Sequence, residues 1–422
     1  MFFLDQFFGH TKKNKYKPIK PQIIRKVPDL FEVVNDFEDI GFADEEHRNV
    51  RKFKRNSDDS SQPELFYFKR ADEKEVVLAN YYRLLLGPDR APKTTPVYKI
   101  VEGQYQYVGL LSKEIDGFRS TSSFYKENKK RYEEEKGIQY QEWAEMDCAG
   151  VLAISMVLGE SDLNGINWGK NCNNQFVRID FGHSGNYVFH NITSNDLLNL
   201  PIVRDYHPSQ WPYKCYHQSD TTWDPYELAG INELEHFRNQ EWKYLLKSIL
   251  IDQQLLKNIN QAYAISEDCS KPLVKRLVEL KKTLFKIPEF KEFIKENSQV
   301  IDEIAAEFEA YNDSVDADNG PQNTKVDIAA IRERHETIFN ACRDNQTLEE
   351  EKDPLTSKKE FKLFKKAYFK QYNSEFFKNP WSTMKLALES GEKYTTMEQV
   401  RQYAQEHQSS RTYKVLHSSM QI

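Results

Sequence analysis

The chain has few cysteines, and none of them stands in a pair of the kind that binds zinc. Its 422 residues include five cysteines, an odd number, with no C-x-x-C spacing. A disulfide framework shows an even number of cysteines at short spacings, and a zinc site shows close pairs. We therefore expect a reducing compartment and predict neither a disulfide framework nor a zinc site.

Long apolar runs and an export signal are also missing. The most apolar stretch, residues 151–158, is far shorter than the ~18 residues that a membrane-spanning helix needs. The first residues, MFFLDQFFGHTKKNK, place scattered Phe and Leu before a basic stretch, which is not the order of regions in a signal peptide. We expect no transmembrane helix and no Sec export.

Aromatic residues, by contrast, are plentiful. Phe, Trp and Tyr make up 13% of the chain, although apolar residues as a whole reach only 39%. A disordered chain would be poor in aromatics, and this length is typical of two or three domains. The composition predicts a globular protein whose core is packed largely by aromatic side chains.

Charge is unevenly distributed around a net value of -6. Residues 10–26 contain seven Lys or Arg and no acid, and a second basic cluster comprises Arg48, Arg51, Lys52, Lys54 and Arg55. Such clusters either bind polyanions or are solvated surface. The negative net charge and the lack of a recognition motif predict that nucleic acid is not a partner.

The periodicity of apolar residues predicts an α+β region followed by helices. Short strands are expected at 65–69, 97–101, 105–111 and 176–179, and helices at 75–86 and 143–158. Apolar spacing is helical again over 227–263 and 273–308, where Leu273, Leu277, Leu280, Leu284 and Ile287 repeat as in a coiled coil or a packed helix face. Residues 312–325, rich in acids, Asn, Gly and Pro, predict a linker.

One lysine and one glutamate stand where phosphoryl transfer from ATP would need them. Lys69 ends the strand 65–69, and Glu75 follows six residues later at the start of a helix. Kinases use such a pair to hold the nonreacting phosphates. A lysine in solvent on an edge strand is the other interpretation.

Three further residues follow in the order that kinases use. Asp162 and Asn167 are five residues apart, which is the spacing of a kinase catalytic loop. Asp180, the first residue of a D-F-G tripeptide, comes after a short apolar strand. Asp and Asn oxygens suit the hard cations Mg²⁺ and Mn²⁺.

Residues 60–182 resemble the protein-kinase and phosphatidylinositol-kinase superfamily. Residues 75–79, 86–87 and 91–94 are similar to the first helix and following segment of type II phosphatidylinositol 4-kinases, and 162–168 resemble their D-x-x-x-x-N-W loop. Residues 108–118 are similar to secreted effector kinases of Legionella. The resemblance implies an α+β, two-lobed kinase-like fold with an all-helical C-terminal domain. The expected parts are a basic extension (1–40), an N-lobe (41–118), a C-lobe (119–311), the linker 312–325 and the C-terminal domain 326–422.

The same resemblance implies a role for each site residue. Lys69 would hold the ATP phosphates with Glu75 as its partner, Asp162 would orient the nucleophile or act as base, and Asn167 and Asp180 would hold Mg²⁺ or Mn²⁺. The backbone of 111–117 would meet adenine. No glycine-rich loop precedes Lys69, and Ser60 and Ser61 would replace its contacts to phosphate. H-R-D and A-P-E motifs are absent as well.

Two anionic partners are expected outside the catalytic site. Inositol hexakisphosphate would bridge the basic clusters and activate the enzyme. Residues 358–370 alternate aromatic residues with six lysines, a pattern typical either of a membrane-surface helix or of a helix packed on a small core. The effector resemblance implies that this region binds phosphatidylinositol 4-phosphate.

These inferences combine into one functional prediction. We expect a secreted bacterial effector in the host cytosol, peripheral to phosphoinositide membranes, that transfers phosphate from ATP to a hydroxyl of a host protein. The alternatives are a phosphoinositide lipid kinase, an enzyme of altered chemistry such as a nucleotidyl transferase, and a catalytically silent scaffold on membranes.

Overall fold

Two compact units make up the chain, residues 1–336 and 337–422. The computed structural model describes residues 38–42, 50–55, 64–102, 104–135, 137–160, 163, 165–182, 184–185, 192–200, 228, 230–264, 268–344, 364, 386–387, 393–394, 400, 403–404 and 414. The fold is α+β, with antiparallel sheets early in the chain and helices after them. The predicted N-lobe and C-lobe ranges both fall in the first unit.

A five-stranded antiparallel sheet opens the first unit. Its spatial order is β1-β2-β3-β5-β4, and its strands are β1 (Glu38–Phe42), β2 (Val50–Arg55), β3 (Glu64–Lys69), β4 (Thr94–Val101) and β5 (Gln104–Lys113). Phe53, Phe66, Val97 and Leu111 form an apolar cluster on it. The strands predicted at 65–69, 97–101 and 105–111 are confirmed, each extended by a few residues.

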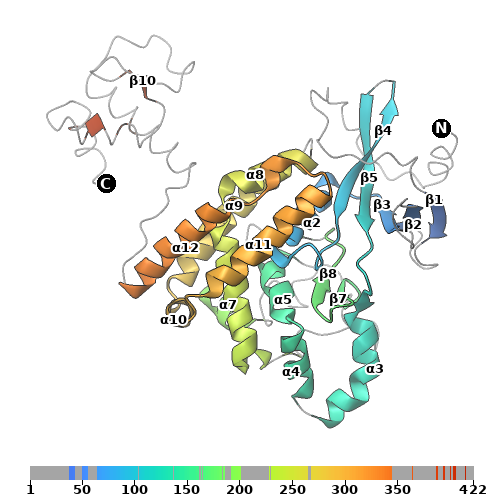
Figure 1. Ribbon diagram of the computed structural model, residues 1–422, viewed down its shortest axis with the longest axis horizontal. Coiled ribbons are helices and arrows are strands. Elements are labelled where there is room, and N and C mark those ends of the chain that lie inside the picture. The colour runs from blue at the N-terminus through green and yellow to red at the C-terminus, as the bar shows by residue number, and fades with distance from the viewer. Residues whose placement is uncertain are drawn as a thin grey trace. The chain divides into compact units, whose positions relative to one another are not determined.

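Helix α2 (Glu73–Leu86) is buried around nearly its whole circumference. It packs against β4 and β5 and against helices that follow much later in the chain, and Figure 1 shows it between the sheet and those helices. Two of its buried polar side chains form hydrogen bonds to distant backbone: the Tyr81 hydroxyl donates to the Leu256 carbonyl at 2.8 Å, and Asn80 donates to the Thr94 carbonyl at 3.0 Å. The position of this helix is therefore fixed from two sides.

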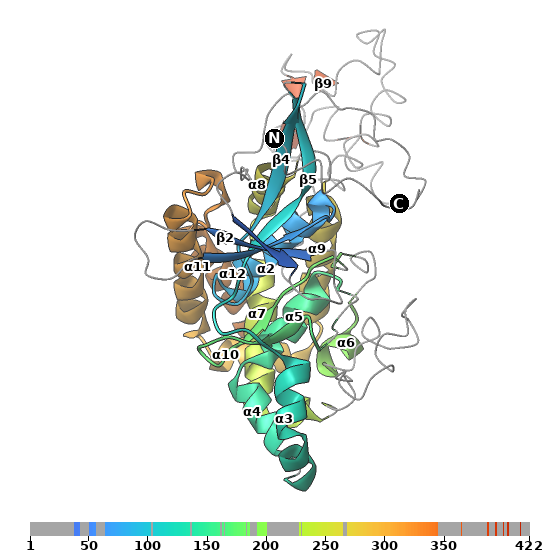
Figure 2. The same ribbon diagram turned by 90° about the vertical axis from the view of Figure 1, so that its right-hand side faces the viewer.

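The next part of the chain combines helices with a small three-stranded sheet. In sequence it comprises β6 (Arg119–Ser120), α3 (Thr121–Glu134), α4 (Ile138–Glu145), α5 (Cys148–Val157), β7 (Trp168–Lys170) and β8 (Phe176–Arg178). In both views α3 and α4 project together, away from the β4–β5 hairpin (Figure 1, Figure 2). Every residue of α5 is buried.

The prediction of a single helix over 143–158 is wrong, because the helix is interrupted at Asp147. This residue adopts a left-handed backbone (φ 61°) and its side chain accepts a hydrogen bond from the Gly150 amide, so it caps α5. Arg90 holds the Asp147 carboxylate at 2.6 Å and the Phe176 carbonyl of β8 at 2.7 Å. A tertiary ion pair therefore ends one helix and starts the next.

Helices make up most of what the structure describes in the rest of the first unit. They are α6 (Ser194–Leu198), the 3-10 turn η6 (Ile231–Glu233), α7 (Glu235–Leu250), α8 (Gln253–Tyr263), α9 (Ser270–Leu284), α10 (Pro288–Glu296) and α11 (Val300–Ala317). Asp252 caps α8 and Pro288 begins α10, so the long helical stretches predicted from spacing are interrupted there. The leucine repeat of α9 is buried, as expected for one packed helix face.

The segment predicted as a linker, residues 312–325, is ordered and packed. Residues 312–317 complete α11, and the 3-10 turn η7 (Gln322–Thr324) follows. Val315 and Thr324 are buried, and the Gly320 amide closes the helix on the Val315 carbonyl at 2.7 Å. Burial of these side chains explains why a polar, glycine-containing stretch is not a linker here.

Helix α12 (Ile328–Arg343) crosses the boundary between the two units. In the second unit, β9 (Leu386–Ala387) pairs antiparallel with β10 (Lys393–Tyr394). The prediction of an all-helical C-terminal domain is therefore wrong, because backbone pairing joins these two short segments. Apart from Phe364, the lysine-rich stretch 358–370 lies outside the described residues, as does the basic extension up to residue 37.

Candidate active site

Lys69 and Glu75 form the ion pair that the sequence predicts. The Lys69 Nζ atom at the end of β3 lies 3.0 Å from Glu75 Oε1 in the first turn of α2. The Glu75 side chain is only 7% exposed, whereas that of Lys69 is 27% exposed. The lysine head is thus held by a buried carboxylate while solvent still reaches it.

Asp180 joins this pair from a segment 111 residues away. Its Oδ1 atom lies 2.7 Å from Lys69 Nζ, and its side chain is 42% exposed. The backbone of Asp180 is left-handed (φ 56°), an uncommon conformation that Asp tolerates better than most residues and that often marks functional sites. The fold therefore gathers Lys69, Glu75 and Asp180 into one cluster, hereafter the triad.

The two residues after Asp180 close over the ion pair. The Phe181 ring is buried and lies 4.7 Å from the Tyr82 ring of α2. The Gly182 amide donates to Asp180 Oδ1 at 3.3 Å. A Cβ atom on Gly182 would lie 3.3 Å from Glu75 Oε2 and 3.4 Å from Lys69 Nζ, so glycine permits this close approach.

Burial and charge perturb all three members of the triad. Burial opposes the charge of Lys69, but the Asp180 and Glu75 carboxylates outweigh it and raise the lysine pKa. Burial also opposes ionisation of Asp180, yet the Lys69 charge outweighs it and lowers the pKa of that aspartate. Glu75 behaves differently, because burial raises its pKa to about 7, with Asp180 adding to the effect and Lys69 opposing it. Perturbed groups of this kind cluster at functional sites.

Asn167 lies beside the strand that leads into Asp180. Its backbone carbonyl accepts hydrogen bonds from the Ile179 amide at 2.8 Å and from Arg178 Nη1 at 2.5 Å. Asn167 is buried, at 7% exposure. Asp162, Ser60 and Ser61 lie outside the described residues.

Oxygen donors are the groups that the site offers to a metal ion. The Asp180 carboxylate is accessible, and an aspartate and an asparagine match the preference of Mg²⁺ and Mn²⁺ for oxygen ligands completed by phosphate and water. In the part of the chain that the structure describes, no group of three or more His, Cys, Asp or Glu side chains could hold a metal by itself. In donor type alone, Asp180 and Asn167 are compatible with an ion whose other ligands come from phosphate and water.

Sequence reasoning missed two charged residues behind the triad, Glu160 and Arg178. Both side chains are fully buried, and Arg178 Nη2 lies 3.0 Å from Glu160 Oε2. A signal was present, because an arginine inside the apolar strand F-V-R-I must find a partner when it is buried. The sequence did not identify that partner.

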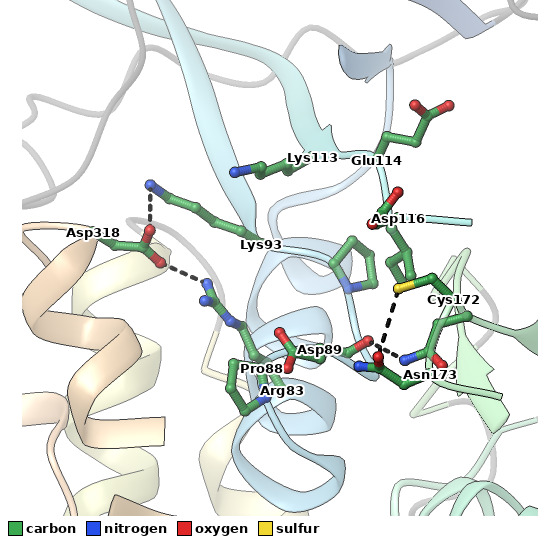
Figure 3. Close-up of a pocket in the computed structure, with 13 residues that line it drawn as sticks. Arg83, Pro88, Asp89, Lys93, Lys113, Glu114, Asp116, Cys172, Asn173 and Asp318 are labelled. Atoms are coloured by element: carbon green, nitrogen blue, oxygen red, sulfur yellow. Dashed lines mark hydrogen bonds and ion pairs between the residues drawn. The ribbon is translucent and has the colours of Figure 1, made fainter. Parts of the chain in front are cut away.

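A cavity of about 400 Å³ borders the predicted adenine-binding segment 111–117 (Figure 3). Three of its lining residues interact, because Asp318 at the end of α11 binds Arg83 at 2.8 Å and Lys93 at 3.3 Å. Lys113, Glu114, Ile115 and Asp116 of the predicted segment also line it. No residue of the triad does, so this cavity is separate from the ion pair.

Three residues of the second basic cluster form ion pairs within the sheet. Lys52 pairs with Glu114 at 3.1 Å, Lys54 with Glu38 at 3.9 Å and Arg55 with Glu64 at 2.9 Å. A polyanion would have to compete with these carboxylates for the same cations. Arg48 lies outside the described residues.

Part of the chain is similar to a known protein family. Residues 119–309 match the LepB N-terminal domain family. The matched range contains Asn167, Arg178 and Asp180 but excludes the five-stranded sheet and α2, and hence Lys69 and Glu75. No curated protein matches the chain. None of the described helices is long and apolar enough to cross a membrane.

Proposed function

We propose that the protein is an ATP-dependent phosphotransferase with a divergent, two-lobed kinase-like fold. The observation that carries this proposal is the triad, in which a strand lysine, a helix glutamate and a D-F-G aspartate meet within 3.0 Å of the lysine nitrogen. Kinases use this arrangement to grip phosphates and bind metal. The antiparallel sheet with one buried helix, followed by helices, is consistent with two lobes.

Each residue of the site has a proposed part in the reaction. Lys69 binds the nonreacting phosphates, and Glu75 keeps its ammonium group in place. Asn167 and Asp180 would hold Mg²⁺ or Mn²⁺, which supplies positive charge to the phosphate oxygens. The acceptor hydroxyl oxygen bonds to the γ-phosphorus while the bond to the β–γ bridging oxygen breaks, and ADP leaves. Asp162 orients the hydroxyl and receives its proton.

The proposed acceptor is a hydroxyl of a host protein. A phosphoinositide hydroxyl is the second candidate, supported by the similarity of residues 162–168 to the D-x-x-x-x-N-W loop of type II phosphatidylinositol 4-kinases. A bacterial effector acting at phosphoinositide membranes in a host cytosol is the proposed setting. It is supported by the match to the LepB N-terminal domain and by the resemblance of 108–118 to Legionella effector kinases.

Labelled ATP turnover tests the proposal. Wild-type protein is incubated with Mg²⁺ or Mn²⁺ and with either host lysate or phosphoinositide vesicles, and Asp180→Ala is run beside it. We expect label transfer by wild type and a loss of at least about 100-fold in Asp180→Ala, because the variant lacks a metal ligand. Equal rates in the two proteins would eliminate the metal-site assignment. Nucleotide binding without transfer to either acceptor would support the silent scaffold.

A further inference from the structure

We propose that the buried Glu160–Arg178 ion pair positions the metal-binding residues Asn167 and Asp180 for the proposed phosphotransfer. This inference rests on the proposed function, and it assigns a role to two residues that do not belong to the triad. They act through the backbone, so they are positioning residues and not catalytic ones.

Arg178 joins two segments that are distant in sequence. It lies at the end of β8, two residues before Asp180, and its Nη1 atom donates to the Asn167 carbonyl at 2.5 Å and to the Ile179 carbonyl at 2.6 Å. The Ile179 amide also donates to the Asn167 carbonyl at 2.8 Å. The guanidinium group thus fixes the carbonyl of one proposed metal ligand and the peptide that precedes the other.

Glu160 extends this connection to the predicted catalytic loop. It lies two residues before Asp162 in the sequence, and its carboxylate binds Arg178 at 3.0 Å and accepts a hydrogen bond from the Ser184 hydroxyl. Ser184 is itself fully buried, four residues after Asp180. The pair therefore contacts Ile179 and Ser184, which flank the D-F-G segment, and Asn167 of the predicted loop.

Stability alone does not account for a pair buried this deeply. Removing two charges from water costs free energy that their attraction does not always repay, and apolar residues of similar size are often at least as stabilising. The Arg178 side chain has 0% exposure, as does that of Glu160. The Arg178 guanidinium carbon also lies 6.0 Å from the centre of the Phe181 ring. Several fixed donors in one planar group are what arginine provides and lysine does not.

Two substitutions test the role. Arg178→Lys keeps the charge but loses the multiple carbonyl contacts, and Glu160→Gln keeps the shape but removes the charge. For a misplaced metal site we expect kcat to fall about 10- to 100-fold and the Mg²⁺ concentration for half-maximal rate to rise about 10-fold. Should either variant not fold, Ser184→Ala removes one hydrogen bond to Glu160 and is expected to change the same two quantities by a smaller factor.

Glu241→Gln is the matched control. Glu241 is also a fully buried glutamate, paired with Arg238 at 2.7 Å on α7, and it shares no hydrogen-bond partner with the triad. Burial raises its pKa to about 8, against the opposing charge of Arg238, so glutamine preserves its charge state near neutral pH. We expect wild-type kcat and Mg²⁺ dependence. If the control loses as much rate as Glu160→Gln, or if Arg178→Lys retains wild-type Mg²⁺ dependence, the positioning role is refuted.

Hydrogen exchange separates this inference from the proposed function. If wild type shows no ATP turnover, the proposed phosphotransferase function is refuted. The positioning role of Glu160 and Arg178 is then tested by hydrogen exchange alone. We expect the Ile179 amide to exchange at least about 10-fold faster in Arg178→Lys than in wild type, because its bond to Asn167 would no longer be braced. An unchanged exchange rate at Ile179 would refute the claim that Arg178 stabilises this hydrogen bond, whatever activity is measured.

Discussion

Replacing Glu75 with glutamine removes the triad carboxylate that titrates near neutral pH. The Glu75 pKa is raised from 4.5 to about 7, chiefly by burial, so the folded protein favours the neutral form. The resulting stabilisation is fully present below pH 4.5 and is lost as the pH rises through about 7. A raise of this size corresponds to about 3 kcal/mol of unfolding free energy. Asp180, with a pKa lowered below 3.8 mainly by Lys69 acting against burial, stays ionised throughout this range.

Urea unfolding of wild type and Glu75→Gln at pH 5, 6, 7 and 8 measures this effect without reference to activity. From pH 5 to 8 we expect wild type to lose up to about 3 kcal/mol relative to the variant, because glutamine cannot ionise. A difference between the two proteins that stays constant with pH would refute the assignment of this titration to Glu75.

If the proposed function holds, the same titration should control how well the protein uses ATP. Only ionised Glu75 pairs fully with Lys69, so kcat/KM for ATP should rise about tenfold per pH unit below pH 7 and level off above it. In Glu75→Gln the decrease of kcat/KM below pH 7 should disappear, and the constant value of kcat/KM above pH 7 should be lower than in wild type. An acid limb of unchanged midpoint in the variant would show that another group causes it.

Three further predictions concern the closure over the ion pair and the two anionic partners. Gly182→Ala should lower kcat/KM about 10-fold, because the added Cβ would lie 3.3 Å from Glu75 Oε2 and that carboxylate would have to shift by a few tenths of an ångström. An unchanged kcat/KM would contradict this close contact. Inositol hexakisphosphate should raise the rate in 0.05 M salt and lose its effect in 0.5 M salt. Since Lys54 is paired within the sheet, Lys54→Ala should retain this activation. Neutralising the lysines of 12–26 should abolish it. If inositol hexakisphosphate changes neither the rate nor the melting temperature, the activator hypothesis is refuted. The 422-residue chain should float with vesicles containing phosphatidylinositol 4-phosphate and not with neutral vesicles. Equal flotation on both would contradict the headgroup preference.

Local sequence pattern was sufficient for the segments that carry the triad. An aromatic strand ending at Lys69, a helix with Glu75 in its first turn and a short apolar strand before Asp180 are all where periodicity placed them. Alternation and helical spacing report which side of a segment is buried, and that information is local. The hairpin at 94–113 was predictable for the same reason.

Breaks within helices were not predictable from that pattern. The helix expected over 143–158 ends because Asp147, held by Arg90, takes a left-handed backbone and caps α5. The segment 312–325 has the composition of a linker, yet burial of Val315 and Thr324 keeps it packed. In both cases contacts with distant residues outweigh local propensity.

The sequence by itself determined which residue types are available for the proposed phosphoryl transfer and on which local elements they lie. Only the tertiary structure decided that Lys69, Glu75 and Asp180 meet, because their contact depends on packing α2 between the sheet and later helices. It also decided that Arg178 pairs with Glu160, since a buried charge requires a partner but the amino-acid sequence does not specify which residue that partner is.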